Sequence, residues 1–462
     1  MGEDGAAPLA TRMPGLKDLA PGTVSPSHSC RLTSVLIYHS VRFAFLSPVM
    51  IRSLLLALLF TTSLAQAENL LPPDARVAII GDSITEQKLY SKYMEAYLLA
   101  CTGRQDIQVF QFGWSGERAS GFAARLENDL SVFHPTVATT CYGMNDGQYT
   151  AYTDAIGAEY EKNMRLVLDG LKAQGVKHIA VGSPGAVDTR FFTRFEPAIY
   201  NDNLAHLRDI VQKLAGEYSL SFANVHDTMT SAMAKAKPVL GQDYDVCGPD
   251  GFHPGPNGHL LMAQAFLKGL KLEGTIGQIT LDLAGESTAT EGHQITARAP
   301  GSLTLASSTW PFCFDADPAA STSTRSILPF TSFNQDLNRY TLVVKGLTKD
   351  KAQVTWGSET KEFTKTQLEA GINLAAEFAT TPFDAAFADL LNAIGSKQAY
   401  ETTMIKNLIT HFRTYSPEAE TDPEFKNALE VLKQKTLEKH AKYNANVRKR
   451  LKAVTHTVSV VE

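Results

Sequence analysis

Short apolar runs alternate with longer amphipathic segments from about residue 76 to residue 270. The short runs have the length and the apolar content of buried strands. They are Val77–Ile80, Ile107–Phe112, Val137–Tyr142, His178–Val181 and Phe222–Val225. Between them, apolar residues recur at helical spacing in segments that include Leu89–Ala100, Ala155–Ala173, Tyr200–Ala215 and Asn257–Leu270. This alternation predicts an α/β fold, with a parallel sheet covered by helices on both faces.

The hydrophobic pattern changes after about Gly274. Apolar and polar residues then alternate in Gln278–Leu283, Ser302–Leu305, Tyr340–Lys345 and Gln353–Trp356, with glycine-bearing turns between some of these segments. An alternation of period two is typical of strands that expose one face. We therefore predict a small antiparallel β module.

Helical periodicity returns at Thr364. The stretch from Phe425 to Val454 is rich in charged residues, which predicts a solvated helix or a helical pair. We therefore expect an α/β domain at residues 68–274, a β-rich accessory region at 275–363 and a helical C-terminal region at 364–462.

The segment Met50–Ala67 has the organisation of a secretory signal peptide. Arg52 precedes an apolar run from Leu54 to Leu64, and Ala65-Gln66-Ala67 forms a small-x-small cleavage site. We therefore predict a secreted or periplasmic protein whose mature chain begins at Glu68.

Residues 1–49 precede this segment and have no clear periodicity. We interpret them as a misassigned start or as a disordered extension. The apolar run of the signal peptide is too short to span a bilayer comfortably, and no later segment is apolar over roughly 18 residues. We therefore expect no stable membrane insertion after signal removal.

Composition restricts the choice of partners. The net charge is -5 and no long run of one sign occurs, which disfavours a nucleic-acid partner and favours a small-molecule or polysaccharide ester. The predicted mature chain has Cys101, Cys141, Cys247 and Cys313, for which an exported protein allows three pairings. No C-x-x-C or H-E-x-x-H motif is present, so we predict no metal. The oligomeric state is left open.

The first candidate for chemistry is the turn Ile80-Gly81-Asp82-Ser83-Ile84, where a predicted strand ends before a helix. Such a turn exposes a serine hydroxyl at the carboxyl edge of a sheet and places the Ser83 N–H at a helix N-terminus, which suits a developing negative charge. Taken alone, Gly-Asp-Ser is more often an ordinary turn with a helix cap.

Two further loops follow the second and third predicted strands. Gly116 lies in the first loop, and glycine lets a backbone N–H approach a ligand closely. Asn145 lies in the second, and its side-chain amide could donate a hydrogen bond to an oxyanion. Each loop is a weak signal in isolation, because glycine-rich turns of this kind are common.

The last candidate is Asp250-Gly-Phe-His253-Pro254, immediately before the final predicted helix of the α/β region. A serine hydroxyl needs a base at neutral pH, and an imidazole base needs a third group that fixes its tautomer. A spacing of three residues lets one turn present both Asp250 and His253. We interpret His259, on the following helix, as structural.

In this order, Ser83, Gly116, Asn145 and His253 resemble the four sequence blocks of the SGNH (GDSL-type) hydrolases, over residues 74 to 272. Ile84 replaces the leucine of the GDSL name. The resemblance implies a three-layer α/β/α fold of flavodoxin-like character and an esterase that needs no cofactor.

The resemblance also implies a role for each residue. Ser83 would be the nucleophile, His253 the base and Asp250 the group that orients it. The backbone N–H groups of Ser83 and Gly116 and the side chain of Asn145 would form the oxyanion hole. The regions after about Gly274 have no counterpart in the resemblance.

The substrate is the least constrained feature. Trp114 and Tyr142 lie beside the Gly116 and Asn145 blocks, where their rings could stack on sugars or could pack under the loops. We expect a short-acyl esterase, acting on acetyl groups of carbohydrates. The alternatives are a lipid acylhydrolase or thioesterase with the same triad, and a non-catalytic binding module.

Overall fold

A five-stranded sheet is the centre of the α/β domain in the computed structural model, which describes residues 69–315, 320 and 322–462. The strand order is β2-β1-β3-β4-β5, and every neighbouring pair is parallel, as the sequence predicts. The bounds are β1 Arg76–Gly81, β2 Gln108–Gln111, β3 Val137–Cys141, β4 His178–Gly182 and β5 Ser221–Ala223. The predicted signal peptide and residues 1–49 lie outside the described residues.

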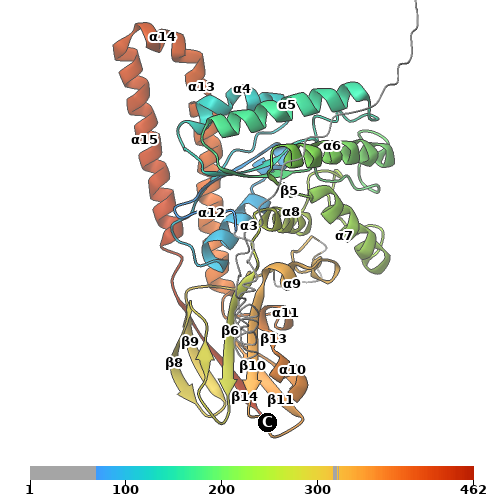
Figure 1. Cartoon of the computed structure of the whole chain (residues 1–462), viewed down its shortest axis with the longest axis vertical. Helices are drawn as coiled ribbons and strands as arrows, with labels where there is room; N and C mark the ends of the chain where they lie inside the picture. The colour runs from blue at the N-terminus through green and yellow to red at the C-terminus, as the bar shows by residue number, and fades with distance from the viewer. Residues whose placement is uncertain (1–68, 316–319, 321) are drawn as a thin grey trace, which may run out of the picture. The chain divides into compact units, whose positions relative to one another are not determined.

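Helices cover both faces of this sheet (Figure 1). Strand β1 divides its side chains between two cores: Val77 and Ile79 belong to one, and Ala78 and Ile80 to the other. Because successive side chains of a strand point to opposite faces, each core lies on its own side of the sheet. The helices are α3 Tyr90–Ala96, α4 Ala119–Leu130, α5 Asp154–Ala173, α6 Pro197–Glu217, α7 Val225–Leu240 and α8 Pro256–Gly269.

Two predicted boundaries differ from the structure. The predicted helix Leu89–Ala100 ends in a π-helical turn, Tyr97–Cys101. The predicted strand Phe222–Val225 stops at Ala223, because the side chain of Asn224 accepts a hydrogen bond from the Asp227 N–H and begins α7.

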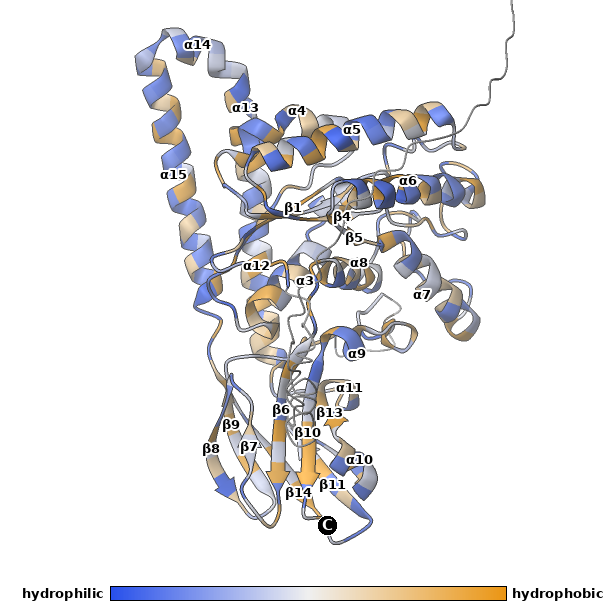
Figure 2. Ribbon diagram, in the orientation of Figure 1, coloured by the Kyte–Doolittle hydropathy of each residue, from blue (hydrophilic) through white to orange (hydrophobic). Residues whose placement is uncertain are grey.

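The β-rich region forms two sheets rather than one, with orders β13-β10-β6-β7 and β12-β11-β14-β9-β8. The prediction that this module is antiparallel is wrong for one pair, since β6 and β10 run parallel. A long connection separates these two strands, and a parallel pair requires such a crossover. Figure 2 shows hydrophobic residues along β10. The strands are β6 Thr275–Asp282, β7 Thr288–Ala289, β8 His293–Ala299, β9 Ser302–Ser307, β10 Arg339–Lys345, β11 Lys351–Trp356, β12 Glu359–Thr364, β13 Ile372–Asn373 and β14 Val454–Val461.

Most of the C-terminal region is helical. Its long helices are α12 Asp384–Met404, which continues into a π-helical turn at Ile405–Ile409, and α15 Pro423–Arg448, whose side chains are mostly exposed. Strand β14 follows and lies between β9 and β11, so the region 364–462 is not helical throughout. The shorter helices are α2 Ser83–Glu86, α9 Phe333–Leu337, α10 Lys365–Ala370, α11 Leu374–Glu377, α13 Thr410–Phe412 and α14 Ser416–Thr421, with 3-10 turns at Leu328–Phe330 and Arg413–Tyr415.

A buried charge cluster, formed by Glu95, Lys397, Glu401 and His440, joins the C-terminal helices to the α/β domain. The Lys397 ammonium lies 2.9 Å from carboxylate oxygens of both Glu95 and Glu401, and it donates to the Val109 carbonyl at 2.7 Å. Glu401 also pairs with His440 at 2.7 Å. Because α3, β2, α12 and α15 all contribute, the helical region packs on the α/β domain as part of one structural unit.

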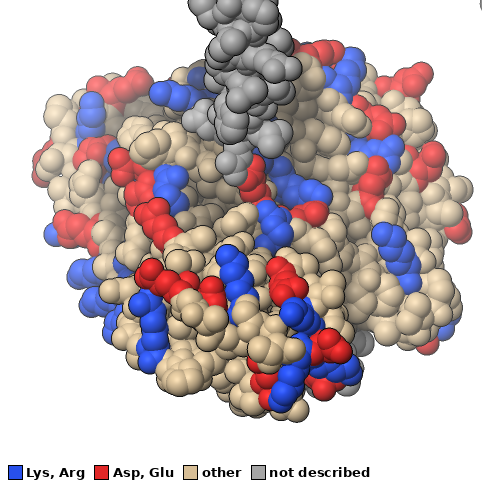
Figure 3. Space-filling model, turned by 60° about the horizontal axis from the view of Figure 1, so that its bottom comes forward, with Lys and Arg blue, Asp and Glu red and all other residues tan. Residues whose placement is uncertain are grey.

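On the face shown in Figure 3, acidic and basic side chains are interspersed. All four cysteines at positions 101, 141, 247 and 313 are buried and free, so none of the three possible disulfide pairings forms in this structure. Within the described ranges, no helix is both long and apolar enough to cross a membrane.

Candidate active site

Ser83 lies at the carboxyl end of β1, where the chain turns sharply into α2. Asp82 caps this helix, because its carboxylate accepts the Ile84 N–H at 3.0 Å. A Cβ atom at Gly81 would collide with the Thr85 side chain and the Cys141 carbonyl, so only glycine fits this turn. The turn therefore holds the hydroxyl of Ser83 at the edge of the sheet.

Two carboxyl groups are buried beneath this edge. Burial raises the pKa of Asp82 to about 7, although the Ile84 N–H opposes the rise. Burial likewise raises the pKa of Asp146 to about 6, although it accepts the Ala119 and Gly143 N–H groups, each at 3.0 Å. Since both carboxyls bind backbone amides, they hold the loops around Ser83 in place.

The structure brings the three predicted catalytic side chains into one hydrogen-bonded chain. The Nε2 atom of His253 lies 2.8 Å from the Ser83 Oγ, and its Nδ1 lies 2.7 Å from an oxygen of Asp250. The other Asp250 oxygen accepts the N–H groups of Phe252 at 3.2 Å and His253 at 3.0 Å. A Cβ atom at Gly248 would collide with the His253 carbonyl, so glycine permits this tight loop.

The charge of Asp250 determines which nitrogen of His253 carries a proton. Partial burial alone would raise the pKa of Asp250, but hydrogen bonds from His253 and Phe252 outweigh it and hold this pKa below its usual value. An ionised carboxylate only accepts, so the Nδ1 of His253 carries the proton and its Nε2 is free to accept the Ser83 hydroxyl proton. This arrangement matches a serine nucleophile with a histidine base.

Two hydrogen bonds hold the amide of Asn145 in one orientation. Its oxygen accepts the Tyr149 hydroxyl at 2.9 Å, and its nitrogen donates to the Glu117 carbonyl at 3.1 Å. One N–H of the amide therefore has no partner among the described residues and can donate to an oxyanion. The loop that carries Gly116 packs on the Ser83 turn, since the Trp114 N–H donates to the Gly81 carbonyl at 3.0 Å.

Replacement of Asn145 by alanine should lower kcat by about 10²–10³-fold with little change in KM, because the amide would stabilise charge that develops only in the transition state. Steady-state kinetics on an aryl acetate measures both constants. Asn392→Ala, at an exposed position of α12, is the matched control and should be silent. An Asn145→Ala enzyme with unchanged kcat would exclude the amide from the oxyanion hole.

Tyr149 is the site residue that the sequence did not reveal. Its ring is stacked near Phe192, and the Arg194 guanidinium lies 4.8 Å from its centroid and 4.4 Å from that of Phe252. Burial raises the pKa of the Tyr149 hydroxyl to about 12, so the hydroxyl is a neutral donor. No local signal marks this residue, because it reaches Asn145 through an unusual backbone turn with φ of 55°.

Of the two alternatives for Tyr142, the structure shows a ring packed under the loops rather than one exposed for stacking. Its ring is fully buried, its hydroxyl donates to Glu117 at 2.7 Å, and it stacks near Phe122. Trp114 is only partly buried, but the cationic groups of Arg125 and Lys406 each lie 4.9 Å from its ring centroid. Its contact with substrate stays a prediction.

His259 packs behind the site as an uncharged residue. Burial lowers its pKa to about 3. Its Nδ1 accepts the Tyr90 N–H at 3.2 Å, and its Nε2 lies 3.0 Å from the Gln87 amide oxygen. These contacts agree with the structural interpretation of this histidine.

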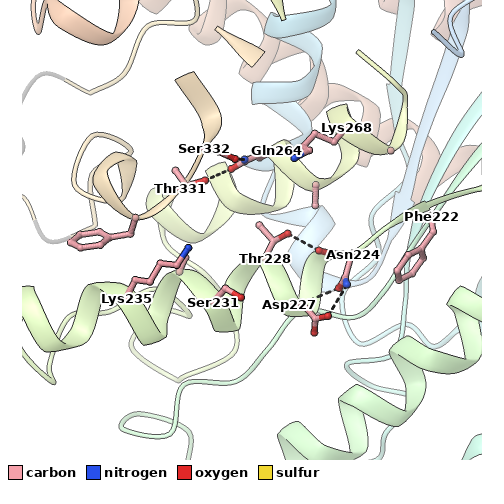
Figure 4. Close-up of a pocket in the computed structure, with 14 residues that line it drawn as sticks. Phe222, Asn224, Asp227, Thr228, Ser231, Lys235, Gln264, Lys268, Thr331 and Ser332 are labelled. Atoms are coloured by element: carbon pink, nitrogen blue, oxygen red, sulfur yellow. Dashed lines mark hydrogen bonds between the residues drawn. The ribbon is translucent and has the colours of Figure 1, made fainter. Parts of the chain in front are cut away.

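A separate cavity of about 470 Å³ lies between α7 and α8 (Figure 4). Ser83, His253 and Asp250 do not line it. Its polar groups are largely paired with one another: Gln264 binds Thr331 and Ser332, and Asn224 binds Asp227. We therefore do not assign the chemistry to this cavity. In the part of the chain that the structure describes, no group of three or more His, Cys, Asp or Glu residues could hold a metal ion.

Two solved structures are similar to this chain, and the first of them shares its fold. A gut microbial diltiazem-metabolizing enzyme matches with a TM-score of 0.66 at 18% identity, over 86% of this chain and 100% of its own. An acetylxylan esterase from Geobacillus stearothermophilus matches over 44% of this chain and 97% of its own, with a TM-score of 0.37 at 24% identity. The first match extends beyond the α/β domain, so its fold includes accessory regions as well.

The sequence also matches a family model. Residues 79–261 match the GDSL-like lipase/acylhydrolase family, whereas no curated protein is similar enough to match the chain. This segment holds the Ser83 turn, the loops of Gly116 and Asn145, and the Asp250–His253 loop. Over residues 79–261, the chain is therefore similar to the GDSL-like lipase/acylhydrolase family.

Proposed function

We propose that this chain is an exported serine esterase that removes short acyl groups, chiefly acetyl, from carbohydrates. The observation that carries the proposal is the hydrogen-bonded chain from Ser83 through His253 to Asp250. In the proposed reaction, the Ser83 oxygen attacks the ester carbonyl while His253 takes its proton, and His253 then protonates the departing alcohol. Water, deprotonated by His253, next releases the carboxylic acid from the acyl-enzyme.

The exposure of the site supports a large polar substrate. The side chains of His253 and Asp250 are 26% and 46% exposed, so a polymer could reach them without entering an enclosed channel. Polar groups of Tyr149 and Arg194 lie near the Asn145 amide and Phe252. A long-chain lipid would require a continuous apolar trough, to which such groups contribute poorly.

The acyl-length preference tests this substrate class. We expect kcat/KM to be highest for acetyl esters and to fall for butyryl, octanoyl and longer aryl esters, with acetylated xylan or pectin oligosaccharides also hydrolysed. Each methylene buried in an acyl pocket would instead contribute about 0.8 kcal/mol. Rates that rise steadily beyond octanoyl would replace the carbohydrate proposal with a lipid acylhydrolase. Diltiazem belongs in the same screen, because one structural neighbour over most of this chain is described as metabolizing it.

Export is a separate part of the proposal, supported by the sequence of Met50–Ala67 alone. Expression in a host with a general secretory pathway should release a protein that begins at Glu68. Mass spectrometry of the secreted material measures this terminus. An intact chain that begins at Met1 and stays in the cytoplasm would contradict it.

A further inference from the structure

The loop that carries Gly116 packs directly on the nucleophile turn, which is formed by residues 81–86. Gly113, at the start of this loop, lies so close to Thr85 and Glu86 that a Cβ atom would collide with their backbone. The Gln111 side chain donates to the Thr85 carbonyl at 2.7 Å, in addition to the bond between Trp114 and Gly81. The Gly116 N–H is therefore positioned relative to Ser83 by contacts between these two segments.

A carboxylate from the nucleophile turn contacts the residue that precedes Gly116. Glu86, the last residue of α2, accepts the Ser115 N–H at 2.5 Å. Because Ser115 directly precedes Gly116, this bond holds the peptide adjacent to the one that carries the Gly116 N–H. The same contact places a negative charge next to a loop that should stabilise a developing oxyanion, which works against catalysis unless the charge is balanced.

A lysine of the C-terminal region supplies that balance. The Lys406 ammonium lies 2.9 Å from both carboxylate oxygens of Glu86, although 320 positions separate the two residues. The side chains of Lys406 and Glu86 are only 22% and 21% exposed. Lys406 also lies over the Trp114 ring, 4.9 Å from its centroid. It therefore contacts the Gly116 loop directly as well as through Glu86.

We propose that Lys406 is a positioning residue for the oxyanion hole, acting through Glu86 and the Ser115 N–H on the backbone of Gly116. Lys406 neutralises the Glu86 carboxylate. It also holds this carboxylate against the Ser115 N–H, which orders the Gly116 loop. The inference rests on the proposed esterase function, and it gives the C-terminal helices a role in the chemistry of a domain whose family match ends at residue 261.

Kinetics on an aryl acetate test this role. Lys406→Met should lower kcat about tenfold and change KM less than about twofold, because a displaced donor costs less than a deleted one. Lys406→Arg keeps the charge and should retain most of kcat. Adding Glu86→Gln to Lys406→Met removes the unbalanced carboxylate and should recover part of the loss.

The control is Lys433→Met, which removes another partly buried lysine of the same region from an ion pair with Glu430 and should leave kcat unchanged. A Lys406→Met enzyme with wild-type kcat, or an equal loss of kcat in Lys406→Arg, would overturn the proposal. Hydrogen exchange gives a readout that needs no activity: amides of residues 113–118 should exchange faster in Lys406→Met. If the wild-type chain hydrolysed no ester, the proposed function would fail, and these exchange rates would still decide whether Lys406 holds the loop.

Discussion

Replacement of Ser83 by alanine should lower kcat for ester hydrolysis by about 10⁴–10⁶-fold while the protein stays folded. The methyl group cannot form the acyl-enzyme, and the 2.8 Å contact between the Ser83 hydroxyl and His253 is lost. His253→Ala should have a comparable effect, since no other basic side chain contacts the Ser83 hydroxyl among the described residues. Asp250→Ala should cost less, because water can reach a side chain that is 46% exposed and partly replace it.

Steady-state kinetics together with a fluorophosphonate probe measures this result, since the probe should form an adduct at Ser83 in the wild type and none in Ser83→Ala. Ser231→Ala, on the exposed surface of α7, is the matched control. Circular dichroism establishes that each variant is folded. Full activity in Ser83→Ala would end the serine-esterase proposal.

Replacement of Lys397 by methionine should lower the free energy of unfolding by about 3–5 kcal/mol, because two buried carboxylates would lose their cation. Burial alone would lower the pKa of Lys397, but Glu401 and Glu95 outweigh it and raise this pKa, so the lysine is charged in the folded state. Its side chain is fully buried. Urea titration followed by tryptophan fluorescence measures the change.

Adding Glu95→Gln and Glu401→Gln to this variant removes the stranded charges and should restore most of the stability. Lys433→Met, which disrupts a partly exposed ion pair, should change the free energy of unfolding by less than about 1 kcal/mol. A similarly small loss in Lys397→Met would show that the cluster does not stabilise the contact between the C-terminal helices and the α/β domain.

The parallel sheet could be predicted because its signals are local. Each strand is a short apolar run, and each predicted block residue follows one of these runs or precedes the last helix. Parallel strands place their carboxyl ends at one edge of the sheet. The separate weak motifs around Ser83, Asn145 and His253 therefore predict one site. Their catalytic roles stay predictions until the variants are measured.

The features that escaped prediction depend on contacts between distant parts of the chain. Tyr149 reaches the Asn145 amide through a turn that its residue type does not favour. Lys406 meets Glu86 across 320 positions. The even number of cysteines suggested disulfides, but a pairing requires two thiols to meet, and here all four are free.

Strand β14 is a different case, because its signal was present in the sequence. Val454–Val461 alternates apolar and polar residues, and His456, Val458 and Val460 are buried in the structure. Because the segment follows a long charged helix, its position in the sequence favours the helical region instead. Its partners, β9 and β11, lie far earlier in the chain. No local pattern shows that their facing edges are separated by the width of one strand.

The position of β14 also sets the order in which the accessory sheet can assemble during synthesis. Thr304 of β9 and Thr457 of β14 are hydrogen-bonded neighbours separated by 153 positions. At roughly 5–20 residues per second, the ribosome needs about 8–30 s to pass from the first to the second. During this interval β9 and β11 each have an unpaired edge, on which strands of another copy could pair. The α/β domain, complete by α8, can fold well before then, whereas the edges of β9 and β11 stay open to aggregation until β14 is made.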